Sequence, residues 1–191
     1  MKKAWGVIAV VAIMVSALAY VTTTGGEAGG SSSHEGARAR ATLRDANNAI
    51  IGKVKLEQDG DVVDIKVNVD GSVAAGFHGF HVHAAGACVA PFTSAGGHYN
   101  PTLATHRDHA GDLPVLYVDA DGEAEARVST DRFALDDLFD ADGSAFILHA
   151  NPDNYANLDL IPGLPYGPSN AVTLATGDAG SRFACGVIEK S

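Results

Sequence analysis

Residues 49–71, "AIIGKVKLEQDGDVVDIKVNVDG", decide the fold class of this chain. Two segments of alternating apolar and polar residues flank Asp59 and Gly60, and this pattern is typical of a β-hairpin, because alternate side chains of a strand point to opposite faces. Further short apolar segments follow: "GFHVHA", "VLYVDADGEAEARVST", "SAFILHA" and "RFACGVIE". Residues 131–143 could hold one helical turn. The sequence predicts an all-β protein, an antiparallel Greek-key β-sandwich or barrel with two long functional loops.

The N-terminal part differs in composition from the rest. Lys2 and Lys3 precede an apolar run over residues 4–21, and Ala17 and Ala19 fit a signal-peptide cleavage site after Ala19. This pattern predicts a signal peptide or a membrane anchor over residues 1–21. We expect a flexible Gly/Ser-rich tether over residues 22–43 and one folded domain over residues 44–191. Either outcome exports the domain, so we expect a periplasmic, cell-surface or secreted protein, and an uncleaved segment 4–21 would tether it to a membrane.

The net charge limits the possible partners of the protein, and the cysteines indicate a disulfide. The formal net charge of −10 argues against nucleic acid as a partner attracted by bulk charge. Cys88 and Cys185 are the two cysteines of the chain. In an oxidising compartment such a pair favours a disulfide, and two buried free thiols are the alternative.

Histidines concentrate in two stretches, "GFHGFHVHAAGAC" (76–88) and "GGHYNPTLATHRDHAGD" (96–112). His81 and His83 are two positions apart, so on a strand they share one face and form half of a copper or zinc site. The second stretch carries three histidines and an aspartate within fifteen residues, a donor set that suits tetrahedral zinc. His149, at the end of an apolar strand, could complete a copper site. His78 lies an odd number of positions from His81, so we expect it to face away from the metals as a hydrogen-bonded structural residue.

Five segments together resemble the signatures of the copper/zinc superoxide dismutase family, in the family's order. They are "GFHGFHVH", "GGHYNP", "HAGDLP", "ILHANPDN" and "TGDAGSRFACGVI". The resemblance covers roughly residues 46 to 188. It implies copper, cycling between Cu(II) and Cu(I), and Zn(II) as cofactors, and superoxide as a small-molecule substrate of an antioxidant enzyme. Monomer and homodimer both stay open.

The resemblance also implies a role for each matching residue. His81, His83, His98 and His149 match the copper ligands. His98, His106, His109 and Asp112 match the zinc ligands, with His98 as an imidazolate that bridges both metals and takes part in catalysis. Asp153 matches the carboxylate that links a copper-site histidine to a zinc-site histidine. Arg182 matches the catalytic arginine beside the copper channel, and Cys88 with Cys185 the intrasubunit disulfide.

Two features of this sequence depart from the family's pattern. Only Arg107 and Asp108 separate His106 from His109, so the backbone must turn sharply for both rings to reach one ion. Residues 150–181, one expected wall of the channel, contain no Lys or Arg. The alternatives to an enzyme are a copper-buffering protein on the same scaffold and a structural module without metals. A complete set of six ligand histidines argues against the latter.

Overall fold

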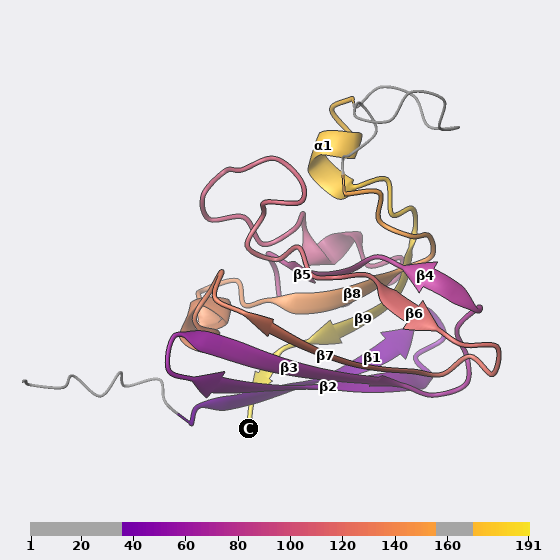
Figure 1. The fold of residues 1–191 in the computed structure, drawn as a ribbon, viewed down its shortest axis with the longest axis horizontal. Helices are drawn as coiled ribbons and strands as arrows, with labels where there is room; N and C mark the ends of the chain where they lie inside the picture. The colour runs from indigo at the N-terminus through magenta and orange to yellow at the C-terminus, as the bar shows by residue number, and fades with distance from the viewer. Residues whose placement is uncertain (1–35, 156–169) are drawn as a thin grey trace, which may run out of the picture. The chain divides into compact units, whose positions relative to one another are not determined.

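The computed structural model describes residues 36–155 and 170–191. In these residues, strands dominate and helices are short (Figure 1). The strands are β1 (Arg38–Asp45), β2 (Ile50–Asp59), β3 (Val62–Val69), β4 (Gly76–His78), β5 (Phe80–His83), β6 (Leu116–Val118), β7 (Ala124–Thr130), β8 (Ala145–His149), β9 (Arg182–Val187) and β10 (Glu189–Lys190). The helical turns are η1 (Thr93–Ala95), η2 (Leu135–Phe139) and α1 (Thr173–Thr176).

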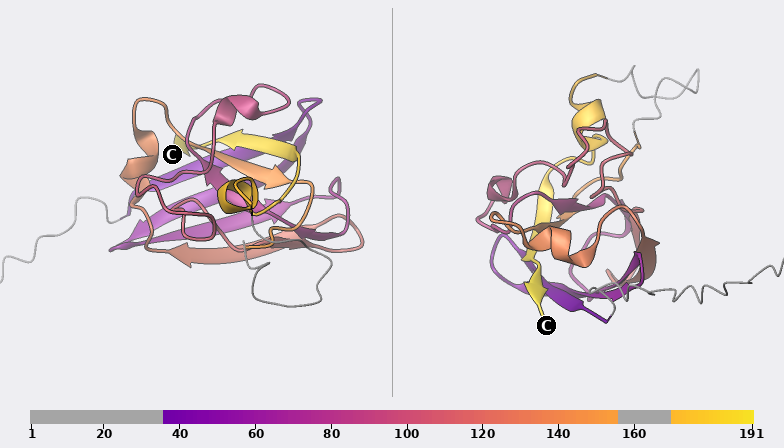
Figure 2. Two further views of the ribbon diagram at one scale, coloured as in Figure 1. Left: turned by 90° about the horizontal axis from the view of Figure 1, so that it is seen from above. Right: turned by 90° about the vertical axis from the view of Figure 1, so that its left-hand side faces the viewer.

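The strands form an antiparallel sheet in the order β5-β8-β9-β1-β2-β3-β7, with β10 paired to β1. β4 and β6 form a separate pair. Strands distant in the chain are neighbours, because β5 pairs with β8 and β3 with β7. The sheet curls on itself (Figure 2). The predicted all-β antiparallel architecture is confirmed.

The β2–β3 hairpin shows why this sequence forms a sheet with one buried and one exposed face. Val54, Leu56 and Ile65 are buried in the core, while Lys55 and Asp64 next to them in the chain are exposed. Gly60 at the turn has a φ of +58°, a conformation that glycine adopts without a steric cost. β5 and β8 differ, because every residue in them is buried. Strands buried on both faces form a rigid support for the histidines that they carry.

The predicted boundary of the tether was wrong for residues 38–43, which belong to β1. Ala39, Ala41 and Leu43 are buried there and alternate with polar residues. Because alanine contributes little apolar surface, the alternation was too weak to be seen in the sequence. The folded domain therefore begins before residue 44. The predicted signal peptide or anchor and residues 22–35 of the tether lie outside the described residues.

Two long loops pack beside β5 and β8. The first joins β5 to β6 over residues 84–115, and the second joins β8 to β9 over residues 150–181, of which 156–169 are not described. Cys88 and Cys185 form a disulfide, as predicted, that ties the first loop to β9. The turn expected within residues 131–143 is η2. Among the described residues, the helices are all too short to cross a bilayer.

Candidate metal centre

Backbone pairing brings the histidine-rich loop against β5. His81 forms an isolated bridge with Asp112, and His83 forms one with His98. The amide of Val82 donates to the carbonyl of Gly111 at 2.9 Å. A Cβ at Gly111 would lie 2.3 Å from the carbonyl oxygen of Val82, so only glycine permits this approach. The loop is thereby positioned with its side chains facing those of β5.

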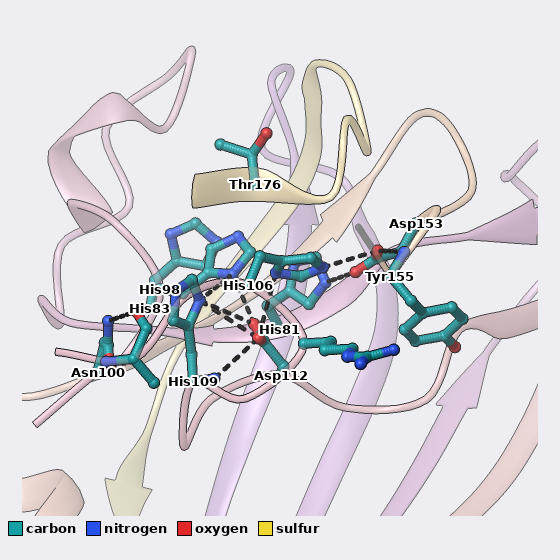
Figure 3. A network of polar contacts seen from close by, with 12 residues as sticks. His81, His83, His98, Asn100, His106, His109, Asp112, Asp153, Tyr155 and Thr176 are labelled. Atoms are coloured by element: carbon teal, nitrogen blue, oxygen red, sulfur yellow. Dashed lines mark hydrogen bonds and ion pairs between the residues drawn. The ribbon is translucent and has the colours of Figure 1, made fainter. Parts of the chain in front are cut away.

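The first group of donors comprises His81, His83, His98 and His149, all buried (Figure 3 labels the first three). His149 follows a β-bulge in β8, an irregularity that can redirect a side chain toward a site. One ring nitrogen of each histidine is buried without a hydrogen-bond partner among the described residues: Nδ1 of His81 and Nε2 of His83, His98 and His149. One ligand atom per residue can be chosen so that all four lie within 4.8 Å of one another.

The other ring nitrogens fix the tautomers of this group. His83 Nδ1 lies 3.0 Å from the carbonyl oxygen of Gly96, and His149 Nδ1 lies 3.2 Å from that of Gly180. A carbonyl oxygen only accepts, so each Nδ1 carries the hydrogen and each Nε2 keeps a free lone pair. His81 Nε2 donates likewise to the carboxylate of Asp153. Buried lone pairs without partners are costly, and lone pairs that converge in this way fit a metal ion.

The second group comprises His98, His106, His109 and Asp112, again buried. Nδ1 of His98 lies 2.7 Å from Asp112 Oδ1. Nδ1 of His106 and of His109 lie 3.1 and 3.2 Å from Asp112 Oδ2. Arg107 has a φ of +74°, which provides the sharp turn that the short spacing requires. Three imidazoles and one carboxylate gathered in this way fit tetrahedral zinc.

His98 is common to both groups through opposite nitrogens. Its Nδ1 faces Asp112 and lies 3.3 Å from Nδ1 of His109. Its Nε2 is among the unpartnered nitrogens of the first group. One imidazole ring therefore presents a donor atom to each group.

Asp153 joins the two groups from outside. Its Oδ2 lies 2.6 Å from His81 Nε2, and its Oδ1 lies 2.8 Å from His106 Nε2 (Figure 3). The amide of Tyr155 donates to the same Oδ1 at 2.6 Å. These hydrogen bonds hold both rings with Nδ1 directed away from Asp153, which is how a carboxylate orients a metal-binding histidine.

Comparison with known proteins gives the family. The profile described as copper/zinc superoxide dismutase (SODC) matches residues 50–188. The chain belongs to the copper/zinc superoxide dismutase family. It is 39% identical over 163 residues to the Cu-Zn superoxide dismutase of Mycobacterium tuberculosis, covering 77% of this chain and 67% of that one. It is 35% identical over 158 residues to an extracellular Cu-Zn superoxide dismutase of Brugia pahangi, covering 80% and 75%.

A solved structure supports the same assignment. The crystal structure of a SOD-like protein from Bacillus subtilis superimposes with a TM-score of 0.61 at 27% identity, covering 78% of this chain and 96% of that one. Copper and zinc are the cofactors of the family, and this chain is an enzyme of it. Both groups of donors described above fit those metals.

Within this superoxide dismutase fold, Arg182 begins β9 and is half-buried. Its guanidinium donates to the carbonyl oxygens of Phe92 and Gly96, both at 2.5 Å. Gly96 also accepts from His83, so the arginine lies close to the first group. His78, in contrast, belongs to neither group. Its ring nitrogens each lie 2.8 Å from a backbone carbonyl oxygen, of His149 and Ala74, which confirms the structural role expected for it.

Two residues that support the zinc group were missed by sequence reasoning. Arg132 Nη1 lies 2.9 Å from the carbonyl oxygen of Arg107, 3.1 Å from that of His109 and 3.4 Å from that of Asp112. Gly177 has a φ of +58° and packs against the Asp153–His106 hydrogen bond. Neither residue belongs to a recognisable ligand pattern. The glycine of "TGDAG" was the only available signal.

Arg132 gives a prediction about zinc. Replacing it with leucine leaves three loop carbonyls without their shared donor, so the loop that carries His106 and His109 should lose order. We expect zinc affinity to fall by about tenfold with little change at copper, because loss of an outer support weakens metal binding by that order. Competition with a chromophoric chelator measures the affinity. Arg132→Lys is the matched variant and should retain part of it; equal zinc affinity in all three proteins would contradict the role.

Burial lowers the pKa of three histidines of the first group in the metal-free protein. It lowers the pKa of His81 to about 4, that of His83 to about 2 and that of His149 to about 3. His106 behaves in the opposite way. Burial alone would lower its pKa, but hydrogen bonds with Asp112 and Asp153 outweigh burial and raise the pKa to about 9. Burial alone would raise the pKa of the Asp112 and Asp153 carboxyl groups, but their hydrogen bonds with the histidines outweigh burial and lower it.

These shifts predict how the stability of the metal-free protein depends on pH. The unfolded chain binds protons at histidine near pH 6.5, above the folded pKa values of His81, His83 and His149. The free energy of unfolding should therefore fall as the pH drops below about 6.5, by about 1.4 kcal/mol per pH unit for each proton taken up. His106 loses its contribution as the pH rises toward 9, which gives a gentler decline above pH 6.5. Denaturant unfolding of chelated protein tests this, and increasing stability from pH 6.5 to 4.5 would contradict it.

Proposed function

We propose that this enzyme dismutes superoxide with copper held by His81, His83, His98 and His149 and zinc held by His98, His106, His109 and Asp112. In this assignment His98 is an imidazolate shared by the two ions. The observation that carries the proposal is the environment of His98. Nδ1 faces Asp112 of the zinc group, and Nε2 is buried, has no hydrogen-bond partner in the described part of the chain and lies near the ligand nitrogens of the other three histidines. Asp153 then orients one histidine on each side.

The residues around the first group suit turnover of a small anion. Copper held by His81, His83, His98 and His149 would supply the one-electron chemistry that converts one superoxide to dioxygen and, with two protons, a second superoxide to hydrogen peroxide. His98 Nε2 is the buried base that can hold one of those protons, since Nδ1 keeps the ring in place through the zinc group. Arg182 supplies a fixed positive charge next to His83, where an anion must arrive.

Export is part of the proposal. A disulfide joins Cys88 and Cys185, and disulfides persist mainly in oxidising compartments. In the sequence before the described part, Lys2 and Lys3 precede an apolar run over residues 4–21. A relative with 35% identity is an extracellular enzyme by name. We propose that residues 1–21 direct export to the periplasm, the cell surface or the medium, as a cleaved signal or an anchor.

Electrostatic steering should be weak in this enzyme. In the sequence, residues 150–181 include no Lys or Arg but include Asp153, Asp159 and Asp178, and the whole chain has a net charge of −10. Arg182 is therefore left without basic neighbours from this segment. We expect the second-order rate constant for superoxide to change little between low and physiological ionic strength, as measured by pulse radiolysis. A steep decrease with added salt would reveal a positive funnel and contradict this expectation.

Metal analysis combined with a superoxide-decay assay tests the function. The protein loaded with copper and zinc should accelerate decay, lose that activity on chelation and regain it when copper is restored. Arg182→Ala should bind copper normally but turn over superoxide more slowly. Stoichiometric copper binding with no acceleration by the loaded wild-type protein would instead support a copper-buffering role.

A further inference from the structure

Phe92 has a backbone conformation that is unusual for a residue with a large side chain. Its φ of +71° and ψ of +13° lie in the left-handed region, immediately before η1. In this region the Cβ lies too close to a backbone carbonyl oxygen, so a bulky residue persists there only when the surrounding structure holds it. Backbone strain of this kind concentrates at functional sites. The conformation of Phe92 therefore indicates that a contact of the folded protein depends on it.

The carbonyl oxygen of Phe92 makes such a contact, because it accepts a hydrogen bond from Arg182. Nη1 of Arg182 donates to it at 2.5 Å, and Nη2 donates to the carbonyl oxygen of Gly96 at 2.5 Å. In the part of the chain that the structure describes, Arg182 forms no ion pair with a carboxylate, so these two carbonyls hold its guanidinium group. The direction of a carbonyl follows the φ and ψ of its own residue. A return of Phe92 to negative φ would turn this oxygen away from Arg182.

The ring of Phe92 keeps the backbone in this conformation. The side chain is 3% exposed and belongs to a small apolar cluster with Ala95, Ala145, Ile147 and Cys185, against which Cys88 packs. Ser94 closes the same loop, because its hydroxyl accepts from the amide of Val89 at 2.9 Å and donates to the carbonyl oxygen of Ala87 at 2.8 Å. Without the ring, the left-handed backbone would lose the apolar burial that offsets its cost.

We propose that Phe92 is a positioning residue for superoxide turnover, because its buried ring holds the left-handed backbone whose carbonyl fixes Arg182 beside the first group of donors. The inference rests on the proposed function, in which Arg182 supplies the positive charge where an anion must arrive. An arginine held by two hydrogen bonds keeps its charge in one place, whereas a released side chain samples many rotamers and reaches solvent, where salt screens it. Phe92 thus acts through Arg182.

The first test observes the guanidinium group by NMR in protein loaded with Cu(I) and Zn(II), which are both diamagnetic. The Nη hydrogens of Arg182 should give separate, slowly exchanging signals, because hydrogen bonds to two carbonyls hinder rotation of the group. Phe92→Ala should lose these separate signals, and Phe92→Leu, which keeps an apolar side chain, should retain them in part. Phe92→Gly also lacks the ring, but glycine adopts the left-handed region without a steric cost, so this variant should be less impaired than Phe92→Ala.

The second test measures the affinity of Cu(II) in the loaded protein for azide, a small anion whose binding changes the visible absorbance. Phe92→Ala should bind azide about three- to tenfold more weakly, the effect of about one lost hydrogen bond, and should cause no further weakening when added to Arg182→Ala. The control is Leu56→Ala, which removes a buried side chain of β2. It should destabilise the fold and leave azide affinity unchanged.

Three results would overturn the proposal. They are wild-type Arg182 signals in Phe92→Ala, azide affinity as low or lower in Phe92→Gly than in Phe92→Ala, and equal weakening by Phe92→Ala with and without the Arg182 side chain. If Arg182→Ala leaves azide affinity unchanged, the role proposed for Arg182 itself fails. Wild-type NMR signals in Phe92→Ala, together with weaker azide binding by Arg182→Ala, would contradict only the inference about Phe92.

Discussion

His98→Ala is expected to reduce superoxide turnover by about 100-fold or more, while three histidines of the first group remain to bind copper. The variant loses the ring that, among the described residues, belongs to both groups of donors. It also loses the base at Nε2, and a positioned acid–base group commonly contributes factors of that size. Copper content, zinc content and the rate of superoxide decay should be measured on the same preparation.

His109→Ala is the matched comparison for this prediction. His109 belongs to the zinc group alone, so its loss should weaken zinc binding and leave the four nitrogens of the first group in place. We expect this variant to retain copper and most of the turnover that His98→Ala loses. If the two variants have the same metal contents and the same rate, His98 has no role beyond that of an ordinary zinc ligand.

Gly177→Ala should disrupt zinc binding although Gly177 is not a ligand. A Cβ at this position would lie 2.1 Å from Asp153 Oδ1 and 2.3 Å from His106 Nε2, so the carboxylate must leave the ring that it orients. We expect zinc affinity to fall by 10- to 100-fold, the range of about one to two orders of magnitude typical when an outer carboxylate is lost. Zinc titration in competition with a chelator gives the affinity, and thermal unfolding of the zinc-free protein gives the cost to the fold.

The control for this prediction is Gly71→Ala. Gly71 has a φ of +70°, similar to that of Gly177, but nothing lies within 4 Å of a Cβ added there. Both substitutions therefore carry the backbone cost of about 1–2 kcal/mol, and only one collides with the site. Equal zinc affinities in the two variants would show that Asp153 can move aside without consequence for the metal.

Features that depend on residues close together in the chain could be predicted from the sequence, whereas features that depend on contacts between distant residues could not. The β2–β3 hairpin was predictable because alternation and the Asp59–Gly60 turn are local. The donor groups were predictable because all their members except Asp112 are histidines, which are crowded and spaced in the family's order. β1 was missed over residues 38–43 because alanines carry its inward face.

Other features depend on contacts that no local pattern records. Arg132 reaches residues more than twenty positions away, and Gly177 supports a hydrogen bond between Asp153 and His106.

In the proposed metal centre, the imidazole ring of His98 connects the two groups of donors. Electron paramagnetic resonance of protein loaded with Cu(II) in both groups tests it most directly. If deprotonated His98 joins the ions through Nδ1 and Nε2, their spins should couple and the signals of isolated Cu(II) should be lost at low temperature. Two independent Cu(II) signals, together accounting for two spins per chain, would show that the ring does not bridge.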